Sequence, residues 1–140
     1  MNIKLALGDW NMQREAAQAV RYEVFVLEQK VPLEMEWDEM DALSLHAVAY
    51  DSKGRAIATG RLLPDGHIGR MAVLRTMRGK QIGSAILQAL MAEAKKRGDR
   101  FVVLNAQTSA QRFYVRHGFV CMGNEFMEAG IPHIQMRYEF

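Results

Sequence analysis

The first part of the chain changes from one hydrophobic period to another. Apolar residues alternate with other residues over positions 3–7, which predicts a short strand. From Asn11 onwards the apolar residues recur every three to four positions, so we expect a helix over residues 11–28 with Asp9 or Asn11 as its cap. The apolar stripe of this helix consists of Met12, Ala16, Ala19, Val20, Val24 and Leu27.

An acidic stretch without a clean period follows this helix. Residues 29–44 contain Pro32 and closely spaced carboxylates, so we expect a loop or a broken helix there. A connection of this length is often functional in a compact domain. Beyond it, residues 46–51, 56–63 and 67–74 have the pattern of strands separated by turn signals, and they predict an antiparallel meander.

The second half of the chain returns to the helical period and then to strands. After Thr76 an apolar face recurs at helical spacing, which predicts a long helix. A buried strand over 101–104, a short helix over 109–117 and two strands over 119–127 and 133–138 follow it. We therefore expect an α+β fold, a mixed α/β sandwich in which helices flank a mixed, mostly antiparallel central sheet.

Composition narrows the class of protein. The chain has 140 residues, of which 49% are hydrophobic and 24% are charged, so we expect one globular domain over residues 1–140. No stretch approaches the length of a membrane span, and the amino terminus lacks the layout of a signal peptide. Cys121 is the only cysteine, which excludes an internal disulfide and a multi-cysteine metal site. We therefore expect a cytoplasmic protein that does not bind membranes.

The formal net charge of +2 hides an asymmetry between the two halves. Residues 1–70 hold 8 Lys or Arg and 11 Asp or Glu, whereas residues 71–140 hold 10 and 5. The two opposed patches are either solvated faces or surfaces that attract charged partners. The basic patch contains Arg70, Arg75, Arg78 and Lys80. The acidic patch contains Glu23, Glu28, Glu34, Glu36, Asp38, Glu39 and Asp41.

Residues 78–85 have the composition of an anion-binding turn between a strand and a helix. Gly79 and Gly83 allow tight turning and close approach of a ligand, and the first helical turn presents unpaired N–H groups at the positive end of the helix dipole. Arg78 and Lys80 add positive charge. An ordinary turn with basic residues is the alternative. The spacing is not that of a Walker P-loop, and no opening βαβ unit supports a Rossmann fingerprint.

Two segments resemble a known family. Arg78-x-x-Gln81-x-Gly83 is similar to the Q/R-x-x-G-x-G/A signature of the GNAT acyltransferase superfamily, with Gln81 where the signature usually has Gly. Residues 112–119 (RFYVRHGF) resemble the FYxxxGF element of the same family. Three further segments are similar to its small bacterial ElaA-type branch, namely residues 24–41, 104–108 and 129–136.

The resemblance implies an acetyl-CoA-dependent N-acetyltransferase that needs no metal. In such an enzyme a primary amine of a small molecule or peptide attacks the acetyl thioester directly in a ternary complex, and many such folds form homodimers. The family pattern assigns the CoA pyrophosphate to backbone groups of the turn, and polarisation of the thioester to N–H groups near Ala72 and Val73. The residues that it places at the cofactor are Met71, Ala72, Val73, Arg78, Gly79, Lys80, Gln81, Ile82, Gly83, Ser84, Asn105 and Tyr114.

Two of these residues have a second interpretation. Tyr114 matches the family's usual general acid, which protonates the departing thiolate, or it is a core aromatic with a paired hydroxyl. Asn105 resembles a cofactor-contacting Asn of the family, or it is a turn residue at the end of its strand.

The base that accepts the amine proton has several candidates. A lysine-like ammonium with a pKa of about 10.4 costs about 4–5 kcal/mol to deprotonate at pH 7, so a base with a raised pKa helps. Glu28 and His133 are the catalytic candidates that we name, and His46 and the acids of residues 34–41 are further ones. Alternatively, the acids form a solvated loop and His46 is a satisfied sheet residue. No His and carboxylate pair has the spacing of a metal site.

Two other functions remain open at this point. A non-catalytic acyl-CoA binding or sensing module would keep residues 78–84 but would not need Tyr114. Nucleic-acid binding is disfavoured, because no helix rich in Arg and Lys carries interleaved aromatic residues. If the chain is catalytic, the basic patch suits the anionic end of CoA, and the acidic patch is a hypothetical attractor for a cationic acceptor.

Overall fold

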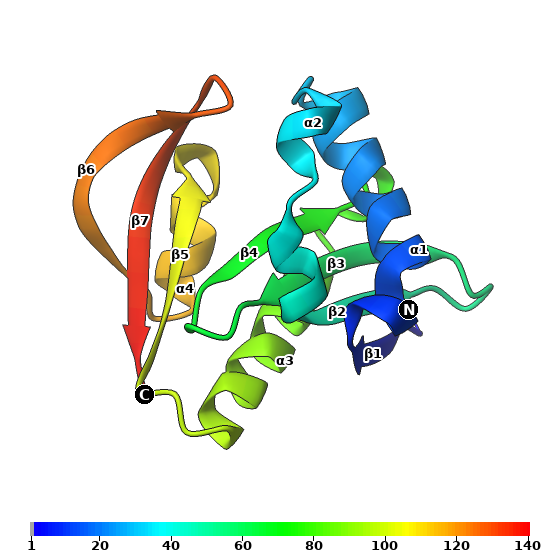
Figure 1. The fold of residues 1–140 in the computed structure, drawn as a ribbon, viewed down its shortest axis with the longest axis horizontal. Coiled ribbons are helices and arrows are strands. Elements are labelled where there is room, and N and C mark those ends of the chain that lie inside the picture. The colour runs from blue at the N-terminus through cyan, green and yellow to red at the C-terminus, as the bar shows by residue number, and fades with distance from the viewer. Residues whose placement is uncertain (1) are drawn as a thin grey trace.

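The seven strands form two antiparallel sheets that lie side by side (Figure 1). The computed structural model describes residues 2–140. The first sheet has the order β1-β2-β3-β4 and the second the order β5-β7-β6. Their bounds are β1 Lys4–Gly8, β2 Leu45–Tyr50, β3 Ala56–Leu62, β4 Ile68–Val73, β5 Phe101–Gln107, β6 Val120–Glu128 and β7 Ile131–Glu139. The predicted meander is therefore present as β2, β3 and β4.

The two sheets join at one point and then diverge. His67 and Val103 form a parallel bridge next to the starts of β4 and β5, where the Val103 N–H donates to Gly66 O at 3.1 Å. Beyond this bridge neither facing edge pairs with the other within residues 2–140. The predicted mixed sheet thus consists of two antiparallel sheets with one parallel contact. The divergence leaves backbone N–H and C=O groups of β4 free to meet a ligand.

Helices cover both faces of the first sheet. The predicted helix over 11–28 is confirmed as α1 Trp10–Arg21 followed by the π-helix η1 Tyr22–Glu28. Asp9 is its cap, because its side chain accepts from the Met12 N–H at 2.9 Å. Helix α3 Ile82–Lys96 packs against β3 and β4 from the other face (Figure 1).

The other helical segments are short. Residues 29–44 form the broken helix that their pattern allows, as α2 Leu33–Glu36 and the 3₁₀ turn η2 Glu39–Leu43. The 3₁₀ turn η3 Arg75–Met77 precedes α3, and the turn η4 Thr108–Ala110 leads into α4 Gln111–Arg116. No helix within residues 2–140 is long and apolar enough to cross a membrane.

The predicted apolar stripe of α1 and η1 is partly wrong. Met12 and Leu27 are 72% and 50% exposed. The buried face instead contains polar side chains, because Gln13 accepts from Tyr50 Oη and Arg21 is held by buried carboxylates. A prediction from apolar residues alone assigns the wrong buried face to a helix that buries paired polar side chains. The buried residues are Gln13, Ala17, Val20, Arg21 and Val24.

Candidate active site

A cavity of about 630 Å³ lies at the start of α3. The chain leaves β4, makes the turn η3, and enters α3 through Gln81 as the N-cap. The N–H groups of residues 79–84 donate to no acceptor within residues 2–140. Six consecutive donors at the positive end of a long helix form a site suited to phosphate. We call this space the loop cavity, and its lining includes Val73, Arg78, Gly79, Gln81, Ile82, Gly83 and Ser84.

Gln81 adopts the backbone conformation that the family signature assigns to Gly. Its φ of 62° and ψ of 19° are left-handed, a conformation that costs a non-glycine residue about 1–2 kcal/mol. Gly79 also has a positive φ of 78°, and a Cβ there would meet nothing within 4 Å. The departure at Gln81 therefore leaves the shape of the turn intact. Lys80 is exposed and does not line the cavity.

Glu28 reaches the loop cavity only through Arg78. Arg78 Nη1 and Nη2 donate to Glu28 Oε2 and Oε1, both at 2.7 Å, and Arg78 Nε donates to Val73 O at 3.0 Å. The hydrogen bonds from Arg78 lower the pKa of Glu28. A general base for an amine needs a raised pKa, so this geometry does not fit the predicted catalytic role of Glu28.

The short helix α4 supplies side chains to the loop cavity that the sequence analysis did not assign. Phe113, Arg116 and His117 line it, and His117 Nε2 lies 2.9 Å from Ser84 Oγ. These residues sit inside the segment that resembles the FYxxxGF element. The sequence signal that could have identified them is their position in this motif, one residue before and two to three residues after Tyr114.

Strand β4 separates the predicted cofactor residues into different surroundings. The Leu74 N–H donates to Ile57 O at 2.9 Å, so Leu74 faces β3 and the Val73 N–H faces the open edge. Val73 lines the loop cavity, and Met71 lines a second cavity on the other side. Ala72 is buried in the core opposite Thr59. Val73 is therefore the better placed of the two residues predicted to polarise a thioester.

The second cavity, of about 590 Å³, lies between the diverging sheets. We call it the cleft cavity. Met71, Asn105, Tyr114 and His133 line it, which brings four of the predicted site residues together. Asn105 is exposed on β5 rather than part of a turn. Apolar residues that also line the cavity are Phe25, Val31, Met35, Ile68, Leu104 and Ile131.

Tyr114 has the properties of a proton donor. The residue is 8% exposed, and burial raises the pKa of its phenol to about 12. Its hydroxyl makes no hydrogen bond to any atom of residues 2–140, although the ring packs against Phe113 and Phe119. Tyr114 therefore belongs to the hydrophobic core, as the alternative expects, but its hydroxyl is unpaired within residues 2–140.

His133 presents one ring nitrogen to the cleft cavity. Its Nδ1 lies 2.7 Å from Ile131 O, and because a carbonyl can only accept, Nδ1 carries the proton of the neutral ring. This leaves Nε2 with a lone pair, 3.5 Å from Glu128 Oε2. The ring stacks on Phe126. Two acceptors at this separation suit a ligand N–H between them.

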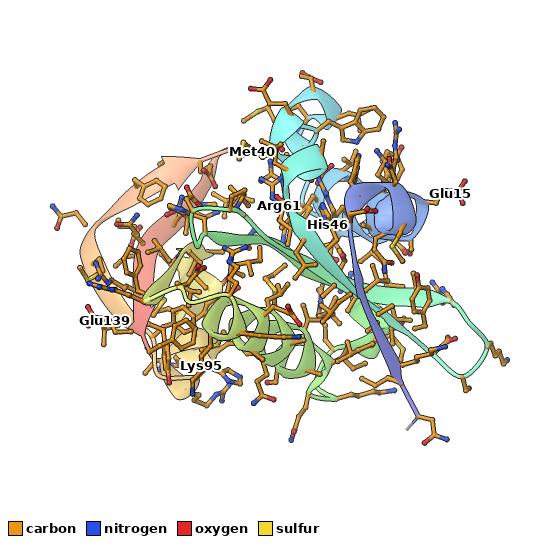
Figure 2. All side chains as sticks on the ribbon, turned by 60° about the horizontal axis from the view of Figure 1, so that its bottom comes forward. Glu15, Met40, His46, Arg61, Lys95 and Glu139 are labelled. Atoms are coloured by element: carbon orange, nitrogen blue, oxygen red, sulfur yellow. The ribbon has the colours of Figure 1, made fainter. Side chains whose placement is uncertain are left out.

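Six charged side chains form one wall of the cleft cavity and the layer behind it, which we call the charged wall. Arg21 donates to Glu36 Oε1 at 2.6 Å and to Asp41 Oδ1 at 2.8 Å. Arg61 donates to Asp38 at 2.7 and 2.8 Å and to Asp41 at 2.8 Å. Figure 2 shows Arg61 and His46 on the side of the first sheet that faces α1. The members are Arg21, Glu36, Asp38, Asp41, Arg61 and Arg70.

The charged wall corrects our interpretation of the acidic patch. Glu36 and Asp41 are 3% and 4% exposed and lie between arginines rather than in solvent. Burial opposes the charged form of Asp38, but hydrogen bonds and attraction from Arg61 outweigh it and lower its pKa. The carboxylates of the charged wall are therefore neutralised internally. They are neither a solvated loop nor a free attractor for a cation.

His46 is a satisfied sheet residue rather than a base. Its Nε2 donates to Asp41 O at 2.9 Å, and burial lowers its pKa. Across the described part of the chain, no group of three His, Cys, Asp or Glu side chains gathers where it could hold a metal ion.

Comparison with known proteins identifies the family to which the chain belongs. A family model described as the acetyltransferase (GNAT) domain matches residues 11–140. The chain belongs to the GNAT acetyltransferase family. A relative in Bacillus subtilis strain 168, named as the uncharacterized N-acetyltransferase YjcF, is 43% identical over 138 residues, which are 96% of this chain and 98% of the relative.

Solved structures confirm the expected GNAT fold and the small bacterial branch. An acyl-CoA N-acyltransferase from Pseudomonas aeruginosa is 30% identical and superposes with a TM-score of 0.86, covering 97% of this chain and 99% of that one. Escherichia coli ElaA is 26% identical with a TM-score of 0.87, and the coverage is again 97% and 99%. The predicted GNAT membership and the acyl-CoA N-acyltransferase fold are thus confirmed.

Proposed function

We propose that this GNAT protein is an acetyl-CoA-dependent N-acetyltransferase that transfers the acetyl group directly to a primary amine of a small molecule or peptide. The observation that carries the proposal is that neighbouring residues of β4 and of α4 line both cavities. Val73 and Phe113 line the loop cavity, while Met71 and Tyr114 line the cleft cavity. An acyl donor held in the loop cavity therefore has its thioester beside the cleft cavity.

The residues of the loop cavity fit the pyrophosphate of CoA. The backbone N–H groups of Gly79 and of residues 81–84 supply the donors, and the dipole of α3 supplies positive potential. Arg78 and Arg116 add cationic side chains around this row, and the Ser84 hydroxyl lies within it. Acetyl-CoA bound there provides the acetyl thioester as the acyl donor.

The chemistry divides between three groups of this chain. The amine nitrogen attacks the thioester carbonyl carbon, and the N–H of Val73 at the open edge of β4 stabilises the charge on the carbonyl oxygen. His133 Nε2 accepts the proton that the amine loses. As the new C–N bond forms, the C–S bond breaks and the sulfur keeps its electron pair. Tyr114 then donates its proton to that sulfur.

The pKa of Tyr114 sets the protonation state that this assignment needs. At about 12 it keeps the phenol protonated throughout the neutral range, which is the form that a general acid needs. The hydroxyl has no hydrogen-bond partner within residues 2–140 and Tyr114 lines the cleft cavity, so the hydroxyl is free to bond the leaving sulfur. In this scheme Glu28 is a partner of Arg78 and does not take part in proton transfer.

Measurement of thiol release from acetyl-CoA tests the proposal. We expect turnover with at least one member of a panel of polyamines, aminoglycosides, amino acids and peptides, together with an N-acetylated product by mass spectrometry. His133→Gln should lower kcat by about 10²-fold and leave CoA affinity unchanged, with Gln135→Asn on the same strand as the control. Tight CoA binding without thiol release on any acceptor would favour a sensing module instead.

A further inference from the structure

Arg70 is the incompletely paired cation of the charged wall. Its Nη2 donates to Asp38 Oδ2 at 3.1 Å and to Met35 O at 3.5 Å. Its Nε lies 3.7 Å from Glu36 Oε1 without a hydrogen bond. Its Nη1 donates to no atom of residues 2–140. Because Nη1 is also absent from the buried side-chain atoms that lack a partner in these residues, it is accessible. One end of this guanidinium is therefore available to a ligand.

The other two arginines of the wall differ from Arg70. Each donates hydrogen bonds to two carboxylates, whereas Arg70 donates to one, and these hydrogen bonds raise the pKa of Arg21 and of Arg61 despite burial. Burial, together with repulsion from Arg61, lowers the pKa of Arg70. An additional anion beside Arg70 would relieve this imbalance, whereas an additional cation would worsen it.

The backbone directs Arg70 toward the cleft cavity. Arg70 has a positive φ of 51°, and the β3–β4 register shifts between Thr59 and Arg61 opposite it. Such an irregularity re-aims a side chain, and strained backbone of this kind is concentrated at functional sites. The Arg70 side chain is 26% exposed and lines the cleft cavity, which also contains His133.

We propose that the acceptor carries a carboxylate as well as its amine and that Arg70 binds this carboxylate. The apolar lining from Phe25, Val31 and Met35 further indicates an apolar side chain on the acceptor. The class of acceptor is therefore a free amino acid with an apolar side chain. The inference rests on the proposed function for the fate of the amine, but carboxylate binding can be measured without turnover.

Paired ligands test this proposal by equilibrium binding. Isothermal titration in the presence of CoA compares phenylalanine, leucine and methionine with phenethylamine, isoamylamine and 3-(methylthio)propylamine, which lack only the carboxylate. We expect at least one amino acid to bind about ten-fold or more tightly than its amine, as a charge-assisted pair predicts. The inference is overturned if no amino acid of the panel binds more tightly than its amine.

Variants assign the preference to Arg70. Arg70→Gln should remove the difference between amino acid and amine, and Arg70→Lys should keep part of it, because Lys retains the charge without the planar fork. Arg55→Gln, at an exposed side chain far along the β2–β3 hairpin, is the matched control that keeps the preference. Thermal melting establishes that each variant is folded. A preference that survives in a folded Arg70→Gln protein contradicts the role of Arg70.

The binding experiment and the thiol-release experiment fail independently. Carboxylate-dependent binding without any acetyl transfer would leave the Arg70 site standing and remove the proposed enzyme. Efficient transfer to the amines that lack a carboxylate, with no preference for amino acids, would leave the enzyme standing and remove the Arg70 site.

Discussion

The loop cavity and the cleft cavity differ in the atoms that they present to a ligand. The loop cavity offers unpaired backbone N–H groups from Gly79 and from residues 81–84. The cleft cavity offers side chains such as Arg70, Tyr114 and His133, from elements far apart in the sequence. A backbone site keeps its donors when side chains change, provided that the turn keeps its shape. A side-chain site depends on which residues the elements bring and on what holds them in place.

The difference suits the two proposed ligands. A site made of main-chain donors recognises a constant group such as a pyrophosphate and tolerates sequence change around it. A site made of side chains can be altered residue by residue, so acceptor specificity belongs there. Substitutions in the two cavities should therefore have separable effects.

Removing the central cation of the charged wall should have the largest effect. Arg21→Met leaves Glu36 and Asp41 buried without the guanidinium that pairs with them. We therefore expect the free energy of unfolding to fall by about 3–5 kcal/mol in urea titrations. Arg55→Met, which breaks an exposed pair at 3.9 Å, should cost less than about 1 kcal/mol. Equal losses for the two variants would contradict a supporting role for the wall.

Tyr114→Phe separates chemistry from binding. We expect kcat to fall by about 10²-fold, at the lower end of general-acid effects, while the Kd for CoA stays the same. Because burial raises the pKa of Tyr114 to about 12, ionisation of this residue should not limit the wild-type rate between pH 7 and pH 10. Tyr138→Phe, which lines neither cavity, is the control. An unchanged kcat across that pH range would remove the general-acid assignment.

The Arg78–Glu28 pair brings a charged side chain to the backbone donors of the loop cavity. If the pyrophosphate competes with Glu28 for the guanidinium, Arg78→Gln should weaken CoA binding by about ten-fold. Glu28→Gln should instead tighten it by a smaller factor. Calorimetry on both variants checks the opposite signs, and weakening in both would show that the intact pair is what binds.

The pH dependence of this pair has a definite sign. Hydrogen bonds from Arg78 lower the pKa of Glu28 in the folded protein below its ordinary 4.5. The pair therefore contributes its full stability above pH 4.5 and loses it as the pH falls through the lower folded value. Wild type and Glu28→Gln should accordingly converge in stability under acid.

Local sequence was sufficient for the turn that carries the backbone donors of the loop cavity. Its donors belong to one turn, so the glycines and the resemblance at Arg78, Gln81 and Gly83 located it before any tertiary contact was known. Tyr114 was found in the same way, from a contiguous motif. Strand and helix positions followed from hydrophobic period for the same reason, since each element carries its own pattern.

No local motif or period in the sequence predicts the charged wall. Arg21 meets Asp41 twenty residues further along the chain, and Arg70 meets Asp38 thirty-two residues back. No spacing rule indicates which carboxylate will find which arginine once the chain folds. The acids therefore resembled a solvated surface, and the paired polar face of α1 was misplaced.

The smallest expected effect tests whether the loop cavity depends on backbone shape alone. Gln81→Gly relieves a left-handed strain of about 1–2 kcal/mol but loosens the unfolded chain by about 0.5–1 kcal/mol. We therefore expect stability to rise by up to about 1.5 kcal/mol in denaturant titrations, with CoA affinity unchanged. Gln81→Val should lower both, because a β-branched side chain resists a φ of 62°. If Gln81→Gly loses CoA affinity, the glutamine side chain itself contacts the cofactor, and the loop cavity is built from side chains as well.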